Sequence, residues 1–233
     1  MGQVSNLIVK AKAGKIRCVV FDFDGVLVDS NEIKRRAYFE IFAPFGDITG
    51  IVEGCLANNR TGNRYQVIEC ILGGLKAIGI LNPDEFAPNP LMYFAEKYNL
   101  ICETYANYCK EIPGASDCLT RLSERYGLYV NSTTLQEPLR RIIRHRGWER
   151  YFREVLGSPQ TKIENLKWIM ERESVTGDEV VFVGDSEVDL AAARTFSCHF
   201  VGIRNTYNDF DSSGLIMLDG LNSLKNVILQ IPK

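Results

Sequence analysis

The sequence predicts an α/β protein, with a doubly wound, Rossmann-like and mostly parallel sheet core that carries an inserted, all-helical cap domain. Three observations predict it. Short and nearly continuous apolar runs are typical of strands buried on both faces. Amphipathic helical stretches separate several of these runs, as in a parallel sheet covered on both sides. One long region has helical periodicity but contains no convincing strand.

The strands of the predicted core are short. The first is the run Cys18-Val19-Val20-Phe21, which leads directly into two acidic residues. Later apolar runs predict four more strands, at 128–131, 180–183, 199–203 and 215–218. Amphipathic stretches predict helices over 115–126, 136–146, 161–172 and 187–196.

Residues 31–111 form the predicted cap, and residues 1–30 together with 112–233 form the predicted catalytic core. Helical patterns run over 64–80 and 91–110, and glycines and prolines divide the region. The chain re-enters the core at Ile112-Pro113-Gly114, a turn signal ahead of the next helix.

Composition excludes several classes of protein. The 233 residues carry a net charge of -2, so there is no basic excess for nucleic acid or a membrane surface. No apolar stretch approaches the ~20 residues that a membrane helix needs. The seven cysteines are odd in number and form no C-x-x-C pair, which favours reduced thiols without a disulfide or zinc site. We therefore expect a cytoplasmic protein, and the sequence leaves its oligomeric state open.

Asp22 and Asp24 are the most informative residues of the chain. They follow the first strand directly and are themselves followed by Gly25. Residues two apart on an extended strand point the same way, so both acids can face one ligand. Burying two carboxylates is unfavourable unless they are paired or bind a cation, so the pattern predicts a site rather than a scaffold.

Other strands deliver polar residues to the same edge of the sheet, where parallel sheets bind ligands. The strand at 128–131 leads into Ser132-Thr133-Thr134, and the strand at 180–183 leads into Gly184-Asp185-Ser186-Glu187-Val188-Asp189. The polar loop 157–162 opens a helix at Lys162. Carboxylates at 22, 24, 185 and 189 suit Mg²⁺. The helix N-terminus after Ser132 would add N–H donors for an anion. Together these parts are what phosphoryl transfer requires.

The arrangement resembles the haloacid dehalogenase superfamily of phosphohydrolases, whose four motifs can be matched in order across roughly the whole chain. The first motif is Asp22 to Ser30, the second is Ser132, the third is Lys162, and the fourth is Gly184 to Asp189. Ile163 stands where many relatives have proline. The insertion is similar to the helical cap of the branch that includes phosphoglycolate phosphatases and β-phosphoglucomutases.

This resemblance implies a role for each motif residue. Asp22 would be the nucleophile that forms an aspartyl-phosphate, and Asp24 would be the general acid and then the base. Ser132, with Thr133 and Thr134 as competing hydroxyls, would donate to a phosphoryl oxygen. Lys162 would neutralise the phosphate and Asp22. The Mg²⁺ ligands would be Asp22, the Asp24 main-chain carbonyl and Asp185, with Asp189 ligating directly or from behind them.

Substrate choice is expected to depend on the cap. The polar segment 58–64 contains Arg60 and Arg64 and could contact the leaving group, although an exposed loop between helices explains it equally well. Lys34 could also reach the cleft. The mutases of this branch usually carry histidine at that position, which counts against mutase chemistry.

The resulting hypothesis is a Mg²⁺-dependent phosphatase that hydrolyses a small phosphorylated metabolite, such as phosphoglycolate or a sugar phosphate. A phosphomutase of the β-phosphoglucomutase type is the first alternative. A non-catalytic protein that accepts or binds phosphate is the second. The partner in each case is a small phosphate ester, and the sequence does not name it.

Overall fold

The computed structural model describes residues 16–59, 63–80, 88–207 and 210–231. Six strands form one sheet in the order β3-β2-β1-β4-β5-β6, and every neighbouring pair is parallel. Their bounds are β1 Cys18–Phe21, β2 Gly127–Leu135, β3 Glu154–Ser158, β4 Val180–Gly184, β5 His199–Ile203 and β6 Ile216–Leu218. The predicted α/β fold with a parallel sheet is confirmed.

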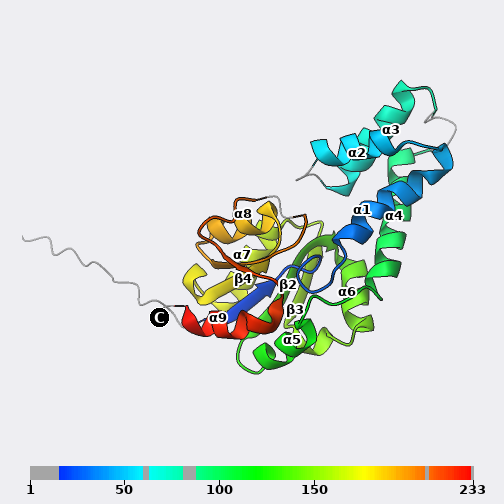
Figure 1. Cartoon of the computed structure of the whole chain (residues 1–233). Helices are drawn as coiled ribbons and strands as arrows, with labels where there is room; N and C mark the ends of the chain where they lie inside the picture. The colour runs from blue at the N-terminus through cyan, green and yellow to red at the C-terminus, as the bar shows by residue number, and fades with distance from the viewer. Residues whose placement is uncertain (1–15, 60–62, 81–87, 208–209, 232–233) are drawn as a thin grey trace, which may run out of the picture.

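Five helices cover the two faces of this sheet (Figure 1). Side chains of α5, α6 and α9 pack against Val19 and Phe21 on one face. Side chains of α7 and α8 pack against Cys18 and Val20 on the other. Successive residues of a strand point to opposite faces, so both faces of β1 are buried. The helix bounds are α5 Ala115–Ser123, α6 Gln136–His145, α7 Lys162–Glu173, α8 Glu187–Thr195 and α9 Leu224–Gln230.

The four helices between β1 and α5 pack on one another, away from the sheet (Figure 1). They are α1 Asn31–Phe42, α2 Thr49–Asn58, α3 Arg64–Ala77 and α4 Pro90–Ala106. Their apolar faces enclose a separate core that includes Phe42, Ile68, Leu75 and Phe94. We refer to these four helices as the cap helices. The exact boundaries of two domains, at 30/31 and 111/112, stay a prediction.

The structure differs from the sequence-based expectation around β2 and β3. The strand β3 was not predicted, because as the edge strand it is only half buried and lacks a continuous apolar run. The strand β2 continues to Leu135, so α6 begins only at Gln136. This start agrees with the helix predicted over 136–146, and the pairing of β2 with β3 is irregular between Asn131 and Leu135.

Two cysteines of the cap helices form a disulfide, which the sequence analysis did not expect. Cys55 of α2 and Cys70 of α3 are bonded, with their Cα atoms 5.8 Å apart. The expectation of reduced thiols is wrong at these positions because α2 and α3 pack together and bring the two side chains into contact. Five other cysteines are free: Cys18, Cys102, Cys109, Cys118 and Cys198.

Within the described ranges, no helix combines the length and the apolar character that crossing a bilayer requires.

Candidate active site

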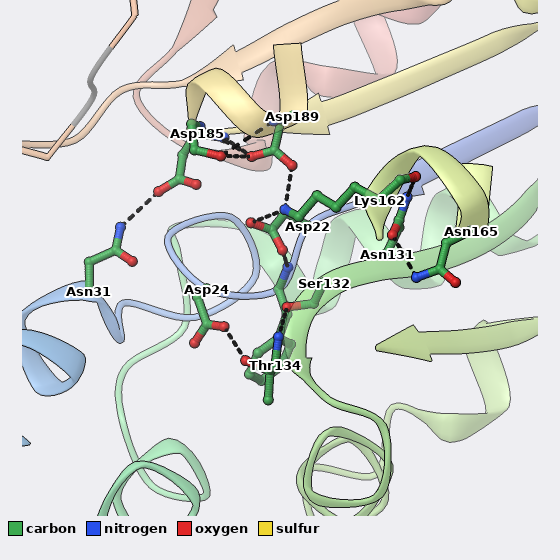
Figure 2. Close-up of polar contacts among 12 residues, drawn as sticks. Asp22, Asp24, Asn31, Asn131, Ser132, Thr134, Lys162, Asn165, Asp185 and Asp189 are labelled. Carbon is green, nitrogen blue, oxygen red and sulfur yellow. Dashed lines mark hydrogen bonds and ion pairs between the residues drawn. The ribbon is translucent and has the colours of Figure 1, made fainter. Parts of the chain in front are cut away.

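Asp22 and Asp24 lie at the carboxyl end of β1, and both are buried. The Asp22 N–H donates to the Val183 carbonyl, which extends the pairing of β1 with β4 by one residue. The chain then turns sharply, and Gly25 adopts φ +75°, a backbone conformation that glycine accepts without strain. In Figure 2 the side chains of Asp22 and Asp24 reach different partners, so the two acids serve two adjoining subsites.

Lys162 joins two of the predicted acids. Its Nζ lies 2.8 Å from Asp22 Oδ2 and 2.5 Å from Asp189 Oδ1. The lysine is only 3% exposed. Burial alone would lower its pKa, but Asp189 and Asp22 raise it, so the ammonium stays charged beside the carboxylates. The predicted closeness of Lys162 to Asp22 is therefore present in the structure (Figure 2).

The start of α7 sets the position of Lys162. Thr161 caps the helix by accepting the Glu164 N–H, while the Glu164 side chain accepts the Thr161 N–H. The buried Asn131 amide donates to the Lys162 carbonyl at 2.9 Å. Asn165 in turn donates to Asn131 Oδ1 at 3.1 Å. These contacts fix the first helical residue, from which the lysine side chain extends toward Asp22.

Asp185 and Asp189 come from the end of β4 and the first turn of α8. Ser186 caps α8, and its hydroxyl donates to Asp189 Oδ2 at 2.6 Å. The same Oδ2 accepts the N–H groups of Asp185 and Ser186. Because Asp189 Oδ1 holds Lys162, both of its oxygens already accept hydrogen bonds or an ion pair. Asp189 therefore joins Lys162 to the end of β4 and the start of α8.

The carboxylates of Asp22, Asp185 and Asp189 present ligand atoms within 4.8 Å of one another. Burial raises the pKa of Asp22 to about 6, with Lys162 opposing and Asp189 adding to the rise. Burial, together with Asp22 and Asp189, raises the pKa of Asp185 to about 8. A divalent cation would relieve this crowding of negative charge, and an all-oxygen donor set suits Mg²⁺. The residues present therefore fit the expected metal.

Asp24 lies in a separate network of donors. Ser30 Oγ donates to Asp24 Oδ1 at 2.6 Å, and Thr134 Oγ1 donates to Asp24 Oδ2 at 2.8 Å. Lys34 Nζ lies 2.5 Å from the same Oδ2. Burial alone would raise the pKa of Asp24, but Lys34 and the hydroxyl donors hold it below its ordinary value. The structure thus pairs Lys34 with the predicted acid–base residue.

The hydroxyl residues at the end of β2 take different positions. Ser132 is buried, and its Oγ accepts the Thr134 N–H at 3.2 Å. Thr133 is exposed, and its carbonyl accepts hydrogen bonds from other segments. Thr134 contacts Asp24, as described above. Of the three, only Ser132 is buried, and it lies within β2, whereas the sequence predicted that the strand ends before it.

A cavity of about 630 Å³ lies between the cap helices and the core. Asp24 and Thr133 line it from the side of the sheet, whereas Lys34 lines it from α1 and Arg64 from α3. Several other lining residues give no signal in the sequence, because only tertiary packing brings them here. They include Tyr38 and Tyr98, whose rings pack 4.4 Å apart, together with Asn99, Cys102 and Tyr207.

Arg64 spans the cavity from the cap helices to the core. It follows Asn63, which caps α3 together with Gln66 in a capping box. Its guanidinium donates to Asn99 Oδ1 and, at 2.9 Å, to the Thr133 carbonyl. In the described part of the chain these partners are neutral oxygens rather than carboxylates. Arg60, the other predicted arginine, lies outside the described residues.

Comparisons with known proteins agree with this geometry. Phosphoglycolate phosphatase of Vibrio parahaemolyticus is 32% identical over 232 residues, which cover 91% of this chain and 96% of that protein. CbbY from Rhodobacter sphaeroides, solved in complex with phosphate, has a TM-score of 0.70 at 19% identity and covers 90% of this chain and 96% of its own. A predicted phosphoglycolate phosphatase from Haemophilus somnus has a TM-score of 0.73 at 18% identity, covering 92% and 98%. At these identities the solved structures show the fold alone.

A family model described as haloacid dehalogenase-like hydrolase matches residues 19–203. The matched segment begins within β1 and ends with β5, and it contains Asp22, Ser132, Lys162 and Asp185. The expected resemblance is thereby confirmed, and with it the expectation of a hydrolytic enzyme. With this match over most of its length, the chain belongs to the haloacid dehalogenase-like hydrolase family.

Proposed function

We propose that this protein is a cytoplasmic, Mg²⁺-dependent phosphatase that hydrolyses a small phosphorylated metabolite through an aspartyl-phosphate on Asp22. The observation that carries the proposal is the contact of one buried lysine with two acids. Lys162 touches Asp22 and Asp189, and Asp185 lies beside them. Positive charge next to a carboxylate nucleophile lets a phosphate dianion approach it, because the charges of the two anions are offset.

In the first step, an oxygen of Asp22 forms a bond to phosphorus while the bond from phosphorus to the leaving oxygen breaks. Lys162 neutralises the phosphoryl oxygens, and the Ser132 hydroxyl donates to one of them. Mg²⁺, held by Asp22 and Asp185 with the predicted help of the Asp24 carbonyl, would supply further positive charge for the phosphoryl group.

Asp24 handles the protons of both steps. Its carboxyl group gives a proton to the leaving oxygen, and the resulting carboxylate then takes a proton from the attacking water. The water oxygen bonds to phosphorus while the bond from phosphorus to Asp22 breaks, which releases inorganic phosphate and restores the Asp22 carboxylate. Lys34 favours the carboxylate form in the substrate-free protein. We expect the contact between Lys34 and Asp24 to open when substrate binds, so that Asp24 can carry the proton.

The leaving group would occupy the cavity under the cap helices. Relatives are named for phosphoglycolate, and another structure of CbbY contains xylulose-1,5-bisphosphate. Both compounds carry a second anionic group besides the reacting phosphate. Arg64 lines this cavity and pairs with neutral oxygens, so its charge is available for such a group. The substrate class we propose is therefore a small phosphate ester with a second anion.

The test of the reaction is hydrolysis of p-nitrophenyl phosphate and of a panel of metabolite phosphates, with Mg²⁺ and with EDTA. Asp22→Asn should lower kcat by about 10⁴-fold or more, because the nucleophile is lost, while the circular dichroism spectrum stays unchanged. Asp117→Asn is the matched control, since Asp117 is an exposed acid in the first turn of α5 and should leave turnover intact. Turnover by Asp22→Asn, or full activity in EDTA, would contradict the proposal.

The test of the substrate class is Arg64→Leu. Loss of the guanidinium should raise KM for phosphoglycolate about 10-fold to 100-fold, because a charged hydrogen bond to the second anion is lost. Hydrolysis of p-nitrophenyl phosphate, whose leaving group carries no second anion, should change little. An equal effect on both substrates would show that Arg64 acts on the fold of the cap helices and not on the leaving group.

A further inference from the structure

Two amide side chains donate hydrogen bonds to the Asp185 carboxylate, and neither has a role in the proposed reaction. Asn31 Nδ2 donates to Asp185 Oδ2 at 2.7 Å, and Asn205 Nδ2 donates to the same oxygen at 2.7 Å. Asn31 is the first residue of α1, and Asn205 lies in the loop after β5. In Figure 2, Asn31 approaches the carboxylate from the side away from Asp22.

The backbone at Gly25 leaves space for the contact between Asn31 and Asp185. A Cβ atom on Gly25 would lie 1.9 Å from Asp185 Oδ2 and 2.4 Å from Asn31 Nδ2, so only glycine leaves room for this contact. A second contact joins the same two segments, because the Tyr207 hydroxyl donates to Glu32. The first turn of α1 and the loop after β5 therefore meet at Asp185.

We infer that Asn31 and Asn205 are positioning residues that fix the rotation of the Asp185 carboxylate, so that it offers one oxygen to a divalent cation. Each carboxylate oxygen has about two acceptor sites, and two amide donors fill those of Oδ2. An oxygen engaged in this way is a poor metal ligand, and the carboxylate is held from binding through both oxygens at once. The inference rests on the cation site of the proposed function but not on the reaction itself.

This restraint has a consequence for the choice of cation. Ca²⁺ accepts carboxylates through both oxygens and tolerates irregular geometry, whereas Mg²⁺ requires near-octahedral geometry with shorter bonds. A carboxylate fixed to one-oxygen ligation therefore favours Mg²⁺. Asn31 and Asn205 thus contribute both to the affinity for Mg²⁺ and to the preference for Mg²⁺ over Ca²⁺.

The experiment measures the binding of Mg²⁺ alone and of Ca²⁺ alone to the full chain by isothermal titration calorimetry. Asn31→Leu and Asn205→Leu keep a side chain of similar size but remove the donor. We expect each variant to raise the Kd for Mg²⁺ about 10-fold or more, the usual effect of losing a residue that orients a metal ligand. The Kd for Ca²⁺ should change less, so the ratio of the two constants falls. Asn226→Leu, an exposed amide of α9, is the control and should bind both ions as the wild type does.

Thermal unfolding without metal shows whether each variant is folded. If a leucine variant does not fold, the serine variant at the same position, Asn31→Ser or Asn205→Ser, is measured in its place. Unchanged Mg²⁺ binding in the variants at both positions would overturn the inference. An equal loss for Mg²⁺ and Ca²⁺ would overturn it too, as would a wild-type chain that binds no Mg²⁺ at millimolar concentration. Binding that follows these expectations without any phosphatase activity would refute the proposed function alone.

Discussion

At the scale of single residues, four aspartates with the same chemistry have different surroundings. Asp189 contacts Lys162 and accepts hydrogen bonds from N–H and hydroxyl donors, so it joins the start of α7 to the start of α8. Asp24 is surrounded by Lys34 and hydroxyl groups, which favour its charged form. Asp22 and Asp185 are buried and also crowded by like charges, and both effects raise their pKa values. The surroundings of each carboxylate therefore distinguish Asp24, the candidate acid–base residue, from the candidate cation ligands.

The pKa of Asp185 predicts how stability depends on pH. In the metal-free folded chain it is about 8, against an ordinary value of 3.8. The folded state keeps a proton that the unfolded state releases between these values, so the free energy of unfolding falls as pH rises through this window. Mg²⁺ binds the ionised carboxylates, so its stabilising effect should grow over the same range.

The measurement is the midpoint of thermal unfolding with and without Mg²⁺ at about pH 5 and about pH 8. We expect the rise in midpoint caused by Mg²⁺ to be larger at the higher pH. Asp185→Asn should lose most of this difference, since the amide does not titrate. A rise that is the same at both pH values would contradict the assignment of the cation site.

At the scale of elements, the ends of helices and strands place the chemistry. Capping boxes start α7 and α8, so Lys162 and Asp189 project from the first turns of two neighbouring helices. A third capping box starts α3 immediately before Arg64. The motif S/T/N-x-x-E/Q/D could be recognised in the sequence before each helix. The structure was needed to show that Lys162 contacts Asp22 and Asp189, and that Arg64 and Asp24 line one cavity.

The disulfide between α2 and α3 gives a prediction for the cap helices. It closes a loop over a sequence separation of 15 residues. Chain-entropy estimates for such a loop are about 3 kcal/mol, so Cys70→Ser should lower the free energy of unfolding of these helices by about 2–4 kcal/mol. Denaturant unfolding followed by far-UV circular dichroism measures the change.

Cys198→Ser is the control for that prediction, because Cys198 is a free thiol at the sheet. A reducing agent should lower the stability of the wild type to that of Cys70→Ser and leave the serine variant unaffected. Wild-type stability that does not respond to reduction would show that the bond contributes nothing in solution.

At the scale of the whole molecule, the chain builds its apolar interior in separate parts. The core of the cap helices contains Leu75, whereas Leu122 belongs to the core between the sheet and α5. The cavity lies between these parts. Ion pairs such as Arg141 with Glu103 and hydrogen bonds such as Arg64 with Thr133 cross from one part to the other. Polar contacts of this kind can open and close without disrupting either core.

Separate cores predict separate responses to cavity-creating substitutions. Leu75→Ala should cost about 2–5 kcal/mol and should lower hydrogen-exchange protection in the cap helices while β1 and β4 keep theirs. Leu122→Ala, the matched substitution in the other core, should lower protection in the sheet and in α5. Hydrogen exchange followed by mass spectrometry distinguishes the two. An equal loss of protection across the whole chain in both variants would show that the molecule unfolds as one unit.

The sequence by itself determined the parallel α/β fold and the edge of the sheet that carries Asp22, Ser132, Lys162 and Asp185. It could do so because buried strands and amphipathic helices leave local patterns, and parallel strands bring their carboxyl ends together. Only the tertiary structure decided the partner of each acid, the edge strand β3, the bond between Cys55 and Cys70, and the amides that hold Asp185. These features depend on contacts between segments far apart in the chain, and such contacts leave no periodic signal in the order of residues.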